Sequence, residues 1–291
     1  MPHALLILSM LLGWSAAPGS IQDATPDATP ACCRSETGRA ATILAAARQE
    51  TVRPEARSSG TDENVAALLD SIDARSESLR GFHSRIRMDS YDDLADETER
   101  RFGRVWMAIP ESGRPSDRMA AVVFERTVES SGRIRERLEH YVYRDCILSD
   151  YDHEARRLVR RRVCEPDDPR DPLRLGEGPI PIPIGQRKAD IVRSFDATMA
   201  ETPPSRLVRD PDGVVGLHLV PRVGTELAQE GDIVAIDYWI RSDDGAPVAV
   251  EILESTGDRT GLVFMKPTFD PDLDDEGRRW LEAPEVDAAT W

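Results

Sequence analysis

Three features of the 291-residue sequence predict an α+β fold. From Phe82 onward, apolar and polar residues alternate in short runs, which is the pattern of half-buried strands. Connections such as Ser131-Gly132 and Asp243-Asp244-Gly245 separate the runs, and such residues favour tight turns between antiparallel strands. Only two obvious helices accompany the runs, one before them and one after Gly185. An antiparallel meander of about ten strands must curl, and a curled sheet has a concave face.

The chain begins with an apolar run from Ala4 to Leu12, which small residues follow. The run is shorter than the ~20 residues that a membrane-spanning helix needs, but it fits the core of a signal peptide. Cleavage fits either after Ala17 or just beyond it, at residues 19–20. We therefore predict that residues 1–20 are a signal peptide and that the mature protein is soluble and exported to the periplasm or cell envelope.

The first strong helical pattern follows a polar spacer. Residues 21–61 begin with a stretch rich in Asp, Thr and Pro, and within them residues 36–50 can form a short helix. Thr61 or Asp62 then fits an N-cap, and Gly81 fits the end of the helix. Between them, apolar residues recur at helical spacing: Val65, Leu68, Leu69, Ile72 and Leu79. We expect the main domain to span residues 62–269.

The expected strands are residues 82–91, 99–109, 118–128, 134–144, 146–151, 157–164, 214–223, 233–241, 246–254 and 261–268. Several of them are apolar on one face and charged on the other, as in Arg133 to Tyr143. Two short helices give little cover for so many strands. Either the apolar faces are simply a core under the helices, or part of that surface forms a cavity.

A proline-rich segment lies between the two blocks of strands. Asp171 to Phe195 reads DPLRLGEGPIPIPIGQRKADIVRSF, and at its centre three prolines alternate with three isoleucines. Proline removes the backbone donors that helices and central strands use, and it pushes the preceding residue toward extended geometry. The segment is therefore a stiff apolar connection. It is either a crossover packed on the core or a lid over an apolar cavity, hinged at Gly178 and Gly185.

Four cysteines suit an oxidising compartment. The pair Cys32-Cys33 lies in the polar spacer, too far beyond the apolar run for a lipid-attachment site. Cys146 and Cys164 flank a predicted hairpin. If Tyr151 pairs with Val159, the two cysteines lie opposite each other and can form a disulfide. A tighter turn would misalign them and leave two free thiols.

The sequence lacks the signatures of common catalytic sites. It has no Gly-x-Ser-x-Gly, no phosphate-binding Gly-rich loop with Lys, no His-Glu-x-x-His and no Cys-x-x-Cys, so neither an enzyme nor a metal or organic cofactor is predicted. A net charge of −16 argues against a nucleic-acid partner. The acidic run from Asp270 to Glu276 lacks the spacing of a calcium loop. Residues 270–291 are therefore expected to form a solvated acidic tail.

Five stretches carry a resemblance to a known family: NVAALLDSIDARSESLRGFHSRI, FGRVWMAI, YVYRDCILSDYDHEARRLVRRRV, PLRLGEGPIPIPIGQRKADIVRSF and GLHLVPR…IDYWI…PVAVEI. In this order they resemble the periplasmic outer-membrane lipoprotein carrier (LolA-type) family, of which this chain looks like a divergent member. The resemblance implies an incomplete, open antiparallel β-barrel with short helices over its concave face. It also implies that this concave face binds the acyl chains of lipoproteins or other lipids.

In that family, a strand arginine holds a lid closed by bonding backbone carbonyls of the lid. The nearest match here is Arg114, in Gly113-Arg114-Pro115, and Arg118 competes with it for this role. The predicted cavity lining comes from the strands and the proline-rich segment: Met107, Phe124, Tyr143, Ile180, Ile182, Ile191, Phe195, Ile236 and Tyr238.

A carrier suits these features because burial alone supplies its binding energy. Hiding about fifteen methylenes from water gains on the order of 12 kcal/mol, so release requires a lid with two states of similar energy. The sequence thus predicts a carrier in outer-membrane lipoprotein sorting, with acyl chains as cargo and a membrane-bound donor or acceptor protein as a further partner. Two alternatives remain open, namely an envelope sensor or adaptor of the same fold and an envelope hydrolase with an unrecognised site.

Overall fold

The computed structural model describes residues 59–110, 117–165, 171, 173, 175 and 182–284. Its main feature is one antiparallel sheet of 11 strands in the order β6-β5-β4-β3-β2-β1-β11-β10-β9-β8-β7. The two edge strands, β6 and β7, do not pair with each other, so the sheet is open. This confirms the predicted α+β open half-barrel, with eleven strands where the sequence indicates about ten.

The strands are β1 (Gly81–Asp92), β2 (Glu97–Ala108), β3 (Met119–Val128), β4 (Ile134–Arg144), β5 (Ile147–Asp152), β6 (Arg157–Arg162), β7 (Phe195–Met199), β8 (Val214–Pro221), β9 (Ile233–Arg241), β10 (Pro247–Glu254) and β11 (Arg259–Phe269). The helices are α2 (Ser59–Ser78), α3 (Lys188–Ser194), α4 (Glu226–Glu230) and α5 (Asp275–Trp280). Within the described part of the chain, no helix has both the length and the apolar content needed to cross a membrane.

The sequence does not predict three of these elements. β7 begins at Phe195, where the spacing from Ile191 suggests that the helix continues, but Phe195 is already extended, with φ −132° and ψ 149°. The short helices α4 and α5 begin at the N-caps Thr225 and Asp274, whose side chains accept backbone N–H groups. In addition, α2 begins at Ser59, ahead of the predicted cap.

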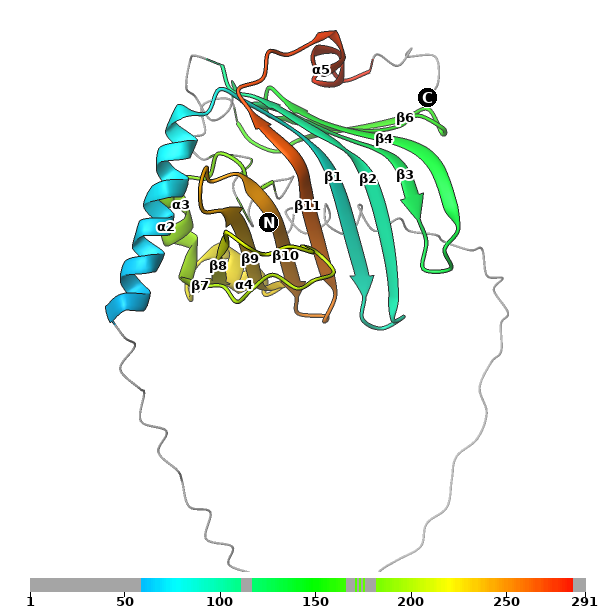
Figure 1. The fold of residues 1–291 in the computed structure, drawn as a ribbon. Helices are drawn as coiled ribbons and strands as arrows, with labels where there is room; N and C mark the ends of the chain where they lie inside the picture. The colour runs from blue at the N-terminus through cyan, green and yellow to red at the C-terminus, as the bar shows by residue number, and fades with distance from the viewer. Residues whose placement is uncertain are drawn as a thin grey trace, which may run out of the picture.

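The chain crosses from one edge of the sheet to the other between β6 and β7. β1 pairs with β11, so the first and last strands lie side by side at the centre of the sheet. The proline-rich segment therefore connects the two edge strands, β6 and β7. We call residues 163–187, which join β6 to α3, the strap. Figure 1 shows α2 and α3 next to each other at one side of the sheet.

One face of the sheet, which we call the inner face, carries two hydrophobic clusters. The first lies on β1 to β5, where Phe82 is opposite Met107. The second lies on β7 to β10, where Val250 is opposite Tyr238 on one side and Leu262 of β11 on the other. Leu262 packs against both clusters, so the inner face is one continuous apolar surface.

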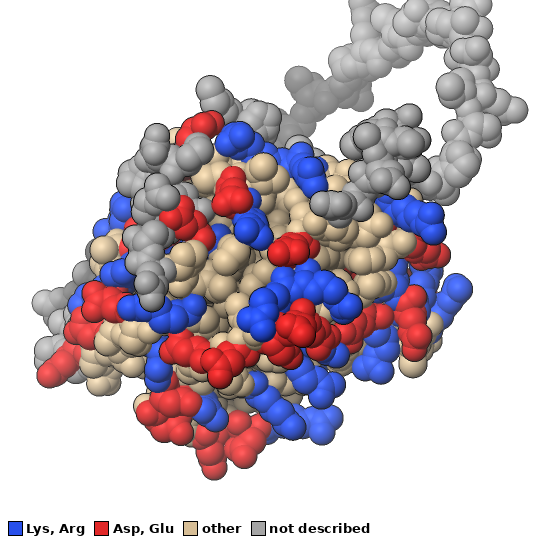
Figure 2. Space-filling model, turned by 90° about the horizontal axis from the view of Figure 1, so that it is seen from above, with Lys and Arg blue, Asp and Glu red and all other residues tan. Residues whose placement is uncertain are grey.

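The inner and outer faces have separate covers. α2, α3 and the strap cover the inner face, where their apolar side chains belong to the two clusters. On the outer face, residues 270–284, which we call the arm, include α5 and place Leu273, Trp280 and Leu281 against β2 to β4. Figure 1 shows α5 above the ends of the strands. On the face seen in Figure 2, basic and acidic side chains lie side by side.

A disulfide joins Cys146 to Cys164, with an S–S distance of 2.07 Å. The hairpin register behind the prediction is wrong by one residue, because Tyr151 pairs with Leu158 and not with Val159. The bridge still forms because Cys146 lies in the β4–β5 turn with a positive φ of 61°. That turn conformation, which alternation along a strand does not reveal, brings Cys146 to Cys164 just beyond the end of β6.

Candidate binding site beneath the strap

The predicted lining residues gather on the inner face. Met107, Phe124, Tyr143 and Ile182 belong to the first cluster. Ile191, Phe195, Ile236 and Tyr238 belong to the second. None of these eight is more than 4% exposed. Ile180, Gly178 and Arg114 lie outside the described residues, so their predicted roles as lining, hinge and latch stay predictions, as does ligand binding by the other eight.

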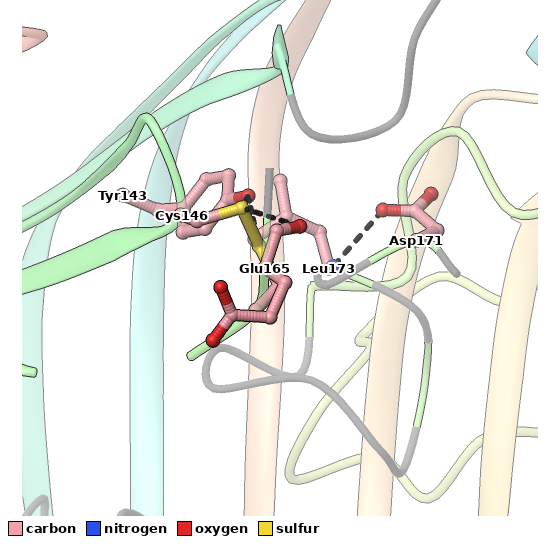
Figure 3. Close-up of a disulfide and its surroundings, with 6 residues drawn as sticks. Tyr143, Cys146, Glu165, Asp171 and Leu173 are labelled. Carbon is pink, nitrogen blue, oxygen red and sulfur yellow. Dashed lines mark hydrogen bonds between the residues drawn. A yellow bond between two sulfur atoms is a disulfide. The ribbon is translucent and has the colours of Figure 1, made fainter. Parts of the chain in front are cut away.

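The strap begins at the disulfide, on the side of the sheet formed by β4 to β6. Tyr143 is fully buried there, and its hydroxyl lies 3.3 Å from Cys164 Sγ. Burial raises the pKa of the Tyr143 hydroxyl, which therefore stays neutral. Figure 3 shows Tyr143 against the disulfide, with Leu173 and Asp171 of the strap nearby. The disulfide thus fixes the start of the strap close to the first cluster.

Arg118, the competitor of Arg114 in the sequence, contacts the strap at two places. Its side chain is 8% exposed and forms an ion pair with the equally buried Asp171 of the strap. The same guanidinium Nη1 donates to the backbone carbonyl of Gly185, 3.2 Å away. Asp171 Oδ1 in turn accepts the N–H of Leu173 at 3.0 Å. One arginine, which directly precedes β3, therefore contacts Asp171 and Gly185 on either side of the proline-rich part of the strap.

A second buried side chain supplies hydrogen bonds within the strap. Gln186 is 2% exposed, and its Nε2 donates to the carbonyls of Leu173 and Ile182 at 3.1 and 3.2 Å. Its Oε1 accepts the N–H of Leu175 at 2.8 Å. Because none of the described strap residues from 171 to 187 pairs with a strand, these backbone groups need side-chain partners when they are buried. Gln186 thus supplies hydrogen bonds to the strap backbone in place of strand pairing, which proline disfavours because it lacks the backbone N–H.

The end of the strap is tied to α2. The backbone N–H of Lys188, where α3 begins, donates to Asp73 Oδ1 at 2.9 Å. Lys188 Nζ pairs with Asp70, and Arg187 lies 3.4 Å from Glu77 Oε1. These side chains are partly exposed, so the ion pairs are weak compared with the buried pair of Arg118. These ion pairs join α2 to the end of the strap but contribute little to stability.

A small cavity lies beneath the described part of the strap. Its volume is about 20 Å³, room for a single water molecule. It lies where α2, the strap and three strands meet, and its lining is Ile72, Arg75, Ser76, Leu79, Pro183, Ile184, Gly185, Tyr238, Gly245, Pro247 and Phe269. An acyl chain is too large for this cavity as it stands.

The inner face becomes charged toward the turns at the far end of β2 and β4. Arg101, 4% exposed, donates to Glu99 at 2.7 Å and to Glu139 at 3.5 Å. The hydroxyl of Tyr141 donates to the same Glu139 at 3.3 Å. Burial, followed by the charge of Glu139, raises the pKa of the neighbouring Asp150. The apolar surface therefore has a polar limit at this end.

The arrangement of the described residues is suited to binding apolar groups. No group of three or more His, Cys, Asp or Glu side chains in the described part of the chain could hold a metal ion. Sequence reasoning missed Asp171, Leu173, Leu175 and Gln186 as site residues. The alternation of Leu173 with Leu175 is a signal for one buried face of an extended segment, whereas no local pattern distinguishes Gln186.

No family model and no curated protein sequence matches this chain. Solved structures that resemble it include an uncharacterised conserved protein from Thermus thermophilus, with 13% identity over 76% of this chain and 95% of that chain and a TM-score of 0.42. A putative outer membrane lipoprotein-sorting protein domain from Vibrio parahaemolyticus also has 13% identity, with coverages of 76% and 99% and a TM-score of 0.35. A LolA superfamily protein from Nitrosomonas europaea has 10% identity, coverages of 73% and 96% and a TM-score of 0.31.

The chain is thus similar to LolA-superfamily and lipoprotein-sorting structures, as the resemblance of its sequence indicates. All three TM-scores lie below 0.5. The functional proposal therefore rests on the geometry of this chain.

Proposed function

We propose that this protein is an exported carrier that holds the acyl chains of lipoproteins or other lipids between the inner face of the sheet and the strap. The observation that carries the proposal is the construction of the strap. Its described inward side chains are apolar, yet buried polar side chains and a disulfide hold it in place, without strand pairing. A segment fastened in this way can leave the sheet without breaking the sheet.

The free energy gained by burying an acyl chain and the free energy lost by moving the strap are of the same order. Burying about fifteen methylenes of an acyl chain gains on the order of 12 kcal/mol. Moving Leu173, Ile182 and Ile184 off the first cluster costs roughly 5 to 9 kcal/mol, at about 1.5 to 3 kcal/mol for each side chain. The ligand thus replaces the contacts that the strap loses. Exchange between two such states allows both capture and release.

The proposed role is binding, not catalysis, and its proposed setting is the periplasm. The apolar run at the N-terminus fits export, and the disulfide suits an oxidising compartment. Within this proposal, the cargo comes from, or goes to, a membrane-bound protein during outer-membrane lipoprotein sorting.

The test is to identify what the protein carries. Full-length protein is purified from the cell envelope and denatured, and the released lipid is identified by mass spectrometry. In parallel, palmitate is titrated against protein loaded with the neutral apolar probe N-phenyl-1-naphthylamine. We expect acylated material in the extract and displacement of the probe. A lipid-free extract together with a probe that no acyl ligand displaces would refute the carrier function.

A strap variant and a matched surface variant localise the binding. Replacing Ile182 and Ile184 with serine removes apolar contacts beneath the strap, and we expect weaker retention of lipid while the sheet remains folded. The control is Ile134→Ser, because Ile134 lies on β4 and is 60% exposed. Circular dichroism of each variant checks that the sheet is intact. Equal retention in all variants would place the ligand elsewhere.

A further inference from the structure

The small cavity lies at the seam between the two hydrophobic clusters. Leu79, Ile184 and Phe269 on its wall pack with the first cluster. Ile72 and Tyr238 belong to the second cluster. If the head of an acyl ligand lies in this cavity, its hydrocarbon tail can run along either half of the inner face.

Ser76 is an unexplained polar residue on the cavity wall. It is 5% exposed, and its hydroxyl has no hydrogen-bond partner within the described part of the chain. On the same helix, the exposed Ser78 donates to the carbonyl of Arg75 at 3.0 Å. Burying a hydroxyl without a partner is unfavourable, so most buried hydroxyls are paired. The Ser76 hydroxyl is therefore available to a group that enters the cavity.

Tyr238 is a second residue of the lining that carries a hydroxyl. It belongs to β9 and is 4% exposed, and none of the hydrogen bonds among the described residues involves its hydroxyl. Burial alone raises the pKa of Tyr238, so the phenol stays protonated and can donate. The Tyr238 ring belongs to the second hydrophobic cluster, and its hydroxyl gives the side chain a polar end.

The charges around the cavity favour an acceptor oxygen. No carboxylate side chain lines it. The one cation in the lining is Arg75, whose guanidinium carbon lies 4.4 Å from the ring centroid of Phe269 and whose Nη2 donates to the carbonyl of Asp244 at 2.6 Å. Two hydroxyls and a nearby guanidinium complement an oxygen with lone pairs and disfavour an ammonium group.

We propose that Ser76 and Tyr238 form a subsite for the carbonyl oxygen at the head of an acyl chain. This inference rests on the carrier function proposed above. A cavity of about 20 Å³ has room for one oxygen atom and not for a hydrocarbon tail. The carbonyl fixes the head of the ligand at the seam, and the tail continues under the strap. Free carboxylates, esters and amides share this carbonyl chemistry.

The test compares ligands that have the same tail with and without an oxygen. Displacement of N-phenyl-1-naphthylamine gives the dissociation constants of palmitate, methyl palmitate and 1-hexadecene for the full chain. The variants are Ser76→Ala, Tyr238→Phe and the double substitution. The controls are Ser78→Ala, on the same helix but exposed, and Tyr151→Phe, on β5 with its ring against His153. Thermal unfolding of every variant reports any loss of folding.

Each single variant should weaken binding of the two oxygen-containing ligands by roughly 2- to 12-fold, the worth of one hydrogen bond, and leave 1-hexadecene unchanged. Equal losses for palmitate and methyl palmitate support recognition of any acyl carbonyl, and a loss for palmitate alone supports a free carboxylate. The subsite is refuted if the oxygen-containing ligands bind all variants equally, or if 1-hexadecene loses as much affinity as they do. If no ligand displaces the probe from the unmodified protein, the carrier function fails together with the subsite.

Discussion

The covers of the two faces satisfy their backbone groups differently. On the inner face, carbonyls of the strap accept hydrogen bonds from Arg118, just before β3, and from Gln186. On the outer face, the arm contains α5, where the side chain of Asp274 accepts the N–H of Gly277 and the N–H of Leu281 returns to the Gly277 carbonyl. The hydrogen bonds within α5 survive if the arm leaves the sheet, although His140 then loses the Trp280 carbonyl. Moving the strap breaks its hydrogen bonds to Arg118.

The side chains that fasten the two covers also differ. A buried ion pair and a disulfide hold the strap. Aromatic rings and a neutral imidazole hold the arm, because the rings of Trp280 and His140 meet edge to face at 5.0 Å and His140 Nε2 lies 2.7 Å from the Trp280 carbonyl. The strap should therefore respond to reductant, whereas the arm should respond to acid.

The largest expected effect is on the strap. Arg118→Ala leaves the buried Asp171 without its guanidinium partner, and we expect a loss of about 3 to 5 kcal/mol in the free energy of unfolding. The matched change on the arm is Arg104→Ala, which removes the partly exposed pair with Glu276 and should cost less than about 1 kcal/mol. Urea unfolding monitored by circular dichroism measures both values.

A double variant sharpens this comparison. Removing Asp171 together with Arg118 deletes both charges, so Arg118→Ala/Asp171→Ala should be more stable than Arg118→Ala alone. Equal losses for Arg118→Ala and Arg104→Ala would show that the buried pair does not distinguish the strap from the arm.

The second effect tests the disulfide. Replacing Cys146 and Cys164 with serine removes a link between residues 18 positions apart, and loop closure of this length is worth about 3 kcal/mol. The strap should then exchange amide hydrogens faster, while exchange in the arm stays unchanged. Hydrogen exchange read by mass spectrometry follows the two segments in one experiment. Faster exchange in both would mean that the bridge stabilises the whole sheet and not the strap.

A structural element can be predicted here when the residues that specify it are close together in the sequence. Ten strands are predictable because alternation and turn residues lie next to each other in the sequence, as at Ser131-Gly132. β7 is missed because Phe195 follows a helix directly, and the apolar spacing across that junction fits a helix as well as a strand. The register of the hairpin is missed because Cys146 adopts a positive φ without being glycine.

The latch shows what sequence reasoning cannot reach. The sequence favours Arg114 and leaves Arg118 as its competitor, and the choice depends on where the strap crosses the sheet. In the structure, Arg118 meets Asp171 and the Gly185 carbonyl, which are 53 and 67 residues away. Gln186 and Ser76 depend on the same crossing. Contacts of this kind are set by the fold, so a pattern in one stretch of sequence does not reveal them.

The smallest expected effect is the response of the arm to acid. Burial lowers the pKa of His140 to about 4, from 6.5 when exposed, and burial also lowers the pKa values of His83 and His153, on which the Arg104 and Asp152 charges act as well. Because the docked arm favours neutral His140, its stabilisation is complete above pH 6.5 and is lost as the pH falls toward 4. We expect the free energy that stabilises the docked arm to fall by about 2 kcal/mol at pH 5, since each unit of pKa shift is worth about 1.4 kcal/mol.

Hydrogen exchange of residues 270–284 between pH 8 and pH 4.5, corrected for intrinsic rates, measures this loss. Glutamine keeps an amide donor for the Trp280 carbonyl but cannot be protonated in this range, so His140→Gln should flatten most of the pH dependence. Any remaining slope then belongs to His83 and His153. The strap provides the internal reference, because residues 163–187 contain no histidine. A strap that opens in parallel with the arm would show that acid loosens the sheet itself, and the difference between the two covers would then lie in their contacts and not in their function.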